Sequence, residues 1–130
     1  MIVVDASALL EVLLRTPAGE RVEQRLFARA VSLGAPHLVD LEVAQVLRRY
    51  AAAGEVSAER GAEAVADLMD LPLQRYPPDV LLPRIWELRR NVTAYDAAYL
   101  ALAEALGAPL VTCDARLASA PGHHAVVEVL

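Results

Sequence analysis

Short apolar runs alternate along this chain with longer segments in which apolar residues recur every three or four positions. The runs predict strands at residues 2–5, 109–114 and 125–129, and the short alternating segment 73–76 predicts another. The periodic segments predict helices at residues 6–14, 17–30, 38–53, 57–71, 77–90, 93–106 and 115–118. Residues 34–36 (Gly-Ala-Pro) predict a turn with room for only a very short strand.

Strands that are separated by helices of this length predict a parallel sheet with helices on both faces. At 130 residues, with 56% hydrophobic residues and no linker or repeat, the chain is expected to form one domain over residues 1–130. The fold class predicted from the pattern is therefore α/β, with a central, mostly parallel sheet between two helical layers.

Two acidic residues stand at the ends of predicted strands, Asp5 after Ile2-Val3-Val4 and Asp114 after the run that begins at Leu110. The carboxyl ends of parallel strands share one edge of the sheet, where open α/β folds bind ligands. Asp96 and Glu42 lie near the starts of two predicted helices and could project to the same edge. Two carboxylates roughly 5 Å apart repel by about 3 kcal/mol at an effective dielectric constant of about 20, so four together favour a bound cation.

Each acid also has a purely structural explanation, and for any single residue both explanations stay open. Asp5 and Asp114 each precede a helix and fit an N-cap, and Asp96 follows Thr93 at capping-box spacing. Glu42 fits a solvated helix face. As a set, the four carboxylates favour Mg²⁺ or Mn²⁺ over Zn²⁺, because the imidazoles of His37, His123 and His124 lie in loops without ligand spacing.

Composition narrows the function classes. The net charge is −5, and all 12 basic residues are Arg, which excludes lysine-dependent chemistry such as a P-loop, a Schiff base or a receiver-type phosphate lysine. The single Cys113 excludes an internal disulfide and is expected to be a packed thiol in a reducing compartment. No apolar run reaches the roughly 20 residues that span a bilayer, and no basic leader is present, so we expect a cytoplasmic protein without a membrane segment.

Four motifs in order carry a family resemblance over essentially the whole chain. They are Asp-x-Ser (Asp5, Ser7), Pro-x5-Glu (Pro36, Glu42), Tyr95-Asp96 and Thr-x-Asp (Thr112, Asp114). With these motifs the chain resembles the PIN-domain ribonucleases and is most similar to VapC-type toxins of bacterial toxin–antitoxin pairs. The resemblance implies a Rossmann-like, three-layer α/β/α PIN fold. It also implies an Mg²⁺-dependent endoribonuclease that leaves 5′-phosphate and 3′-hydroxyl ends.

The resemblance also assigns roles to residues. The implied catalytic set is Asp5, Glu42, Asp96 and Asp114. Asp5 and Asp96 would ligate Mg²⁺ directly, Glu42 would orient the attacking water, and Asp114 would ligate a second metal or act through water. Ser7 and Thr112 would support the site. The side chains proposed to steer the RNA backbone, each of which fits ordinary surface solvation equally well, are Arg84, Arg89, Arg90 and Arg116.

Partners follow from the resemblance too. It implies an RNA substrate, a homodimer, and a cognate VapB-like antitoxin that lays a helix into a groove near the acids, formed by the helices at 6–14, 17–30 and 38–53. A group of the antitoxin that binds carboxylates, such as an arginine, would block the site. The alternative is a non-catalytic binding module with the same fold, in which the acids are caps. A receiver domain is disfavoured by the missing lysine, and a DNA nuclease by the absence of extra helical insertions.

Overall fold

A fully parallel five-stranded sheet forms the centre of the molecule. The structure, a computed structural model, describes residues 1–130. Its strand order is β3-β2-β1-β4-β5, so the first strand lies in the middle of the sheet. The strands are β1 (Ile2–Val4), β2 (Leu33–Pro36), β3 (Leu73–Tyr76), β4 (Leu110–Thr112) and β5 (Val127–Val129). The predicted three-layer α/β class is confirmed.

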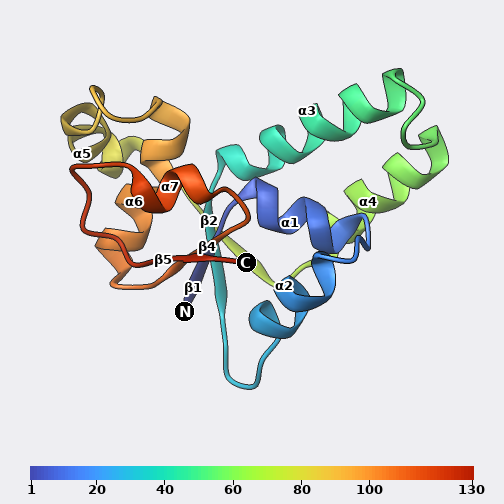
Figure 1. The fold of residues 1–130 in the computed structure, drawn as a ribbon, viewed down its shortest axis with the longest axis horizontal. Helices are drawn as coiled ribbons and strands as arrows, with labels where there is room; N and C mark the ends of the chain where they lie inside the picture. The colour runs from blue at the N-terminus through green and yellow to red at the C-terminus, as the bar shows by residue number, and fades with distance from the viewer.

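Helices cover the two faces in two groups (Figure 1). The first group, on the right in that view, holds α1 (Ala6–Leu13), α2 (Gly19–Leu26), α3 (Leu38–Ala52) and α4 (Ala58–Asp70). The second group holds the 3₁₀ turn η1 (Asp79–Leu81), α5 (Leu82–Glu87) and α6 (Ala94–Leu106). The short helix α7 (Ala115–Ser119) packs beside β5.

The core explains why β1 and α6 are apolar throughout. All three residues of β1 are buried because helices cover both faces of this central strand. Helix α6 buries seven consecutive residues, Ala97–Ala103, against the middle of the sheet. It begins at the Thr93 cap and ends at Gly107, which has the left-handed conformation (φ 60°) that favours glycine. The first turn of α6 is thereby fixed at the carboxyl edge of the sheet.

Three predicted elements differ from the structure. The segment predicted mainly as a turn is the buried strand β2, which pairs with β1 and β3 on its two sides. Helix α2 ends at Leu26 instead of continuing to residue 30, because Leu26 is its last buried residue and Ala30 has a positive φ (64°). The segment 77–90 forms only η1 and α5. The remaining helices and strands lie where they are predicted, within a few residues at each end.

No helix in the structure has both the length and the apolar character needed to cross a membrane.

Candidate active site at the carboxyl edge of the sheet

Asp5 is a buried carboxylate held by three donors. It follows β1 and is the N-cap of α1, where Oδ1 accepts the backbone N–H of Ala8 at 3.0 Å and the hydroxyl of Ser7 at 2.7 Å. Its Oδ2 accepts the hydroxyl of Thr112 at 2.5 Å. Only 5% of Asp5 is exposed, and burial raises the pKa of its carboxyl although all three hydrogen bonds act to lower it. A cap needs only one oxygen, so the contact of Thr112 with Oδ2 shows that both oxygens are fixed.

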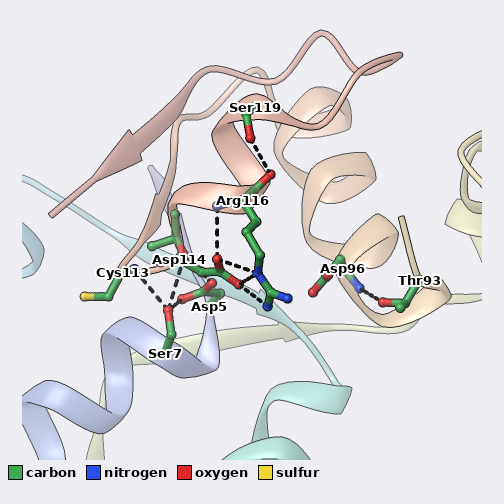
Figure 2. Close-up of polar contacts among 9 residues, drawn as sticks. Asp5, Ser7, Thr93, Asp96, Cys113, Asp114, Arg116 and Ser119 are labelled. Carbon is green, nitrogen blue, oxygen red and sulfur yellow. Dashed lines mark hydrogen bonds and ion pairs between the residues drawn. The ribbon is translucent and has the colours of Figure 1, made fainter. Parts of the chain in front are cut away.

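Ser7 and Thr112 form a small network that ties α1 to β4. Their hydroxyl oxygens lie 3.2 Å apart, Ser7 Oγ accepts the N–H of Cys113 at 3.0 Å, and Thr112 Oγ1 accepts the N–H of Asp114 at 2.9 Å. Thr112 is fully buried. The two residues therefore orient Asp5 and also hold the backbone that carries Asp114; Figure 2 shows Ser7 between Asp5 and Cys113.

Glu42 points toward the same edge from α3 and is not a simple solvated residue. Its Oε1 accepts the hydroxyl of Tyr99 at 2.5 Å. Burial raises the pKa of the Glu42 carboxyl, the Tyr99 hydroxyl opposes this rise, and the charges of Asp96 and Asp5 add to it. Burial and Glu42 together raise the pKa of Tyr99 far above its ordinary value, so the phenol keeps its proton and remains a donor.

Asp114 and Asp96 face each other across Arg116. Asp114 caps α7, with Oδ1 accepting the N–H of Arg116, and both carboxylate oxygens also bind the Arg116 guanidinium, with Nη2 to Oδ2 at 2.7 Å. The Asp96 carboxylate forms no ion pair; it points out of the helix toward Arg116 (Figure 2). The backbone N–H of Asp96 donates to the Thr93 hydroxyl at 3.2 Å. The second hydrogen bond of a capping box, in which the Thr93 N–H would donate to the Asp96 carboxylate, is not formed.

Mutual repulsion links the four carboxylates in a ring, which we call the carboxylate ring: Asp5, Glu42, Asp96 and Asp114. Asp114 raises the pKa of Asp5 and that of Asp96, while Asp5 and Asp96 each raise the pKa of Glu42. For Asp96 burial is the larger cause, and Arg116 opposes it. Arg116 lowers the pKa of Asp114 through its hydrogen bonds. The four acids, distant in sequence, therefore lie within electrostatic reach of one another, with Arg116 paired to Asp114; their role as one site stays a prediction.

The donor chemistry of the ring fits a hard divalent cation that keeps part of its water shell. No three acidic, histidine or cysteine side chains lie close enough together to form a preformed metal cage. Mg²⁺ rarely needs one, because it keeps several waters and binds through one or two carboxylates. All four members of the ring offer oxygen, and the burial that raises the pKa of three of them makes a neutralising cation favourable.

Other predicted residues lie outside the ring. Arg84 is not free to steer a substrate, because it binds Glu104 through two nitrogens (2.9 and 3.1 Å) and Glu87 at 2.9 Å. Cys113 follows β4 and is only partly buried, with burial as the main cause of its raised pKa. The imidazole of His123 contacts the Leu117 carbonyl through Nε2 and accepts the Ala125 N–H at Nδ1. It contacts no member of the carboxylate ring. The contact near the site that sequence reasoning missed is that of Tyr99 with Glu42; Tyr99 is the one aromatic side chain in the buried stretch Ala97–Ala103 of α6.

The Tyr99–Glu42 contact yields a stability prediction. Replacing Tyr99 with Phe should lower the free energy of unfolding by about 1.5–3 kcal/mol, because a partly buried carboxylate loses a strong donor. In a Glu42→Ala background the same change should cost much less, since the phenol there has already lost this acceptor. Urea denaturation of the two single variants and the double variant measures the coupling. Equal losses in both backgrounds would show that the hydroxyl acts elsewhere.

Known proteins share the sequence pattern and the fold of this chain. The family model described as "PIN domain" matches residues 2–122. Ribonuclease VapC12 of Mycobacterium tuberculosis is 42% identical over 130 residues, covering 100% of this chain and 99% of that protein. Ribonuclease VapC9 of the same organism is 48% identical over 117 residues, covering 90% and 88%. The crystal structure of VapBC2 from Rickettsia felis, bound to a DNA fragment from their promoter, superposes with a TM-score of 0.71 at 16% identity, covering 99% and 98%, which shows a shared fold.

Proposed function

This chain belongs to the PIN-domain family, with relatives named as VapC ribonucleases, and from that membership we propose that it is a metal-dependent endoribonuclease acting at the carboxylate ring. The proposal extends to the role of toxin in a VapBC-like pair, with RNA as the substrate. The observation that carries it is Asp5: a carboxylate that is buried, fixed through both oxygens and within electrostatic reach of Asp114 and Glu42, with no cationic partner of its own. As an N-cap alone, Asp5 would need none of this.

The chain's own residues supply orientation and proton transfer. Asp5 and Asp96 are the proposed ligands of Mg²⁺, with Mn²⁺ as a substitute, and Asp114 contributes directly or through water once Arg116 releases it. Glu42, whose carboxylate accepts the Tyr99 hydroxyl, is the proposed residue that orients an attacking water and accepts its proton. When bound, the cation supplies stabilisation of the negative charge that develops on the phosphate and makes water easier to deprotonate. Without it, the ring would repel a phosphodiester.

Chelation is the direct test. RNA cleavage by the purified chain should fall to background in excess EDTA and return with Mg²⁺ or Mn²⁺, because the ring cannot accept a phosphate without a cation. Calorimetric titration of Mg²⁺ into the EDTA-treated and dialysed protein should show saturable binding. Undiminished cleavage in EDTA would overturn the metal mechanism. If Mg²⁺ neither binds nor supports cleavage, the non-catalytic module with capping acids is the better description.

A groove beside the ring suits the proposed antitoxin. It has a volume of about 590 Å³ and runs between α1 and α3, next to Ser7 and Glu42, with apolar residues such as Leu10 and Val46 along its length. An amphipathic helix could bury its apolar face there and carry a basic side chain to the ring. Helix α2, included in the sequence-based prediction of this groove, does not line it. A homodimer remains part of the proposal, and light scattering of the chain with and without its antitoxin measures it.

A further inference from the structure

A second hollow, distinct from the groove between α1 and α3, lies beside the carboxylate ring and includes Asp96 in its lining. It has a volume of about 660 Å³ and is bounded by the turn between α5 and α6 and by α7. Arg89, Arg90, Asn91 and Thr93 line one wall. The hollow shares two residues with the site described above, Asp96 of the ring and Arg116, so it opens onto the reacting centre.

Two arginines of this hollow are available to an anionic ligand. Arg90 is exposed and its side chain makes no ion pair or hydrogen bond within the chain. Arg89 also lacks a carboxylate partner; its guanidinium lies 4.6 Å from the ring centre of Trp86, and Nη1 donates to the Trp86 carbonyl at 2.9 Å. This stacking fixes the guanidinium while leaving other N–H groups free. Arg84, in contrast, is fully occupied by Glu104 and Glu87.

The position of these charges is informative because the chain as a whole is acidic, with a net charge of −5. A polyanion that reaches the carboxylate ring is repelled by most of the surface. It needs local cations immediately beside the ring, and the hollow is where Arg89 and Arg90 provide them. Bidentate N–H groups of arginine match the oxygens of a phosphate, and exposed aromatic side chains such as Trp86 can stack an unpaired base.

We infer that this hollow is a phosphate subsite for single-stranded RNA, which binds a phosphodiester adjacent to the one cleaved at the ring. The inference rests on the proposed function, since it assigns the path of that substrate. RNA is favoured over an acidic protein segment for two reasons. The hollow is continuous with the reacting centre through Asp96, and its lining is mainly polar, whereas the apolar surface expected for a protein helix lies in the groove between α1 and α3.

The test is RNA binding without cleavage. Fluorescence anisotropy with a labelled single-stranded RNA, in EDTA and checked for intact RNA, compares the wild type with Arg89→Gln/Arg90→Gln. The matched control is Arg29→Gln/Arg48→Gln, which removes two exposed arginines that also lack ion pairs but lie elsewhere. The first variant should bind at least about 10-fold more weakly. Its slope of log K against log salt should be shallower by about 0.7, because the subsite neutralises one phosphate and each neutralised phosphate on a single strand contributes about 0.7.

The outcomes are separable. The subsite is supported if the control variant stays within about 2-fold of the wild type, circular dichroism shows both variants folded, and Arg90→Gln alone gives an intermediate loss. Equal losses in both double variants would mean a general charge effect and would overturn the subsite. The subsite would also be overturned if the wild type bound a labelled hexaglutamate as tightly as it binds the RNA and if Arg89→Gln/Arg90→Gln abolished that binding too. If the wild type cleaves RNA while these tests fail, only the subsite is wrong; if the wild type does not cleave RNA, the proposed function is wrong.

Discussion

Replacing Asp5 with Asn is expected to lower the rate of RNA hydrolysis by at least about 1,000-fold, which corresponds to about 4 kcal/mol of transition-state stabilisation. The substitution removes the charge of the most buried member of the carboxylate ring and nothing else of similar size. A discontinuous cleavage assay with a labelled RNA, at saturating Mg²⁺, measures the effect. Calorimetry should show weaker Mg²⁺ binding by the same variant.

The stability and the cleavage rate of the Asp5→Asn variant together separate a catalytic role from a structural one. The Asn side chain keeps an oxygen for the Ala8 N–H and the Ser7 hydroxyl, and the Thr112 hydroxyl can turn toward Ser7, whose oxygen lies 3.2 Å away. The desolvation cost of a buried charge is removed. In the absence of metal at pH 7, the free energy of unfolding should therefore equal that of the wild type or exceed it. A cap that served stability alone would also keep its stability in Asp5→Asn, because Asn caps a helix as well as Asp, but cleavage would then be unaffected; only Asp5→Ala would cost such a cap about 0.5–2 kcal/mol.

The pH dependence of this difference has a definite sign. The unfolded Asp5 carboxyl ionises near its ordinary value of 3.8, and burial raises its pKa in the folded state. Between those two values the folded protein binds more protons than the unfolded chain, so this group's contribution to stability falls as pH rises. The advantage of Asp5→Asn in metal-free buffer should therefore be absent below about pH 4 and grow toward neutral pH. Urea denaturation across this range measures it.

The matched control is Asp67→Asn, an exposed residue of α4 with no ion pair. It removes the same charge from an exposed position outside the carboxylate ring. It should change neither the rate of cleavage nor the pH profile of stability. Wild-type cleavage by Asp5→Asn would remove the ring from the mechanism. A large loss of stability at pH 7 would make Asp5 a structural residue first.

Much of this site could be predicted from sequence because two of its acids mark positions that local patterns define. Asp5 and Asp114 follow buried apolar runs, and a strand that ends at the carboxyl edge of a parallel sheet places its next residue at that edge. Their predicted capping role is also real, since each accepts a backbone N–H of the helix that follows. The structural and the functional explanations of these two acids are therefore compatible.

The parts that could not be predicted depend on contacts between distant segments. Glu42 has the spacing of a solvated helix face, and only the folded arrangement of α3 and α6 brings it to the Tyr99 hydroxyl. β2 has the composition of a turn, yet it is buried because the sheet continues on both of its sides. Gly34 fits there because a Cβ would lie 3.1 Å from the Tyr76 ring and 3.2 Å from the Met1 sulfur. The engagement of Arg84 with Glu104 likewise depends on how α5 packs against α6.

The largest expected loss of stability comes from Gly19, at the start of α2. A Cβ at this position would lie 2.2 Å from the backbone oxygen of Glu11 and 2.7 Å from its carbonyl carbon, so α2 begins directly against the backbone of α1. Gly19→Ala must push the two helices apart, because neither clashing atom belongs to a flexible side chain. We expect the free energy of unfolding to fall by about 3 kcal/mol, despite the gain of up to about 1 kcal/mol in helix propensity.

Gly61→Ala in α4 is the matched control, since the same substitution there places a Cβ with no atom within 4 Å. It should raise stability by about 0.5–1 kcal/mol. Circular dichroism during urea denaturation is the suitable measurement, because the single Trp86 is largely exposed and its fluorescence would respond weakly to unfolding. Opposite signs for the two substitutions would support the close approach of α1 and α2. A stable Gly19→Ala variant would contradict it and, because α1 begins at the Asp5 cap, would also put in doubt how firmly that helix holds the site.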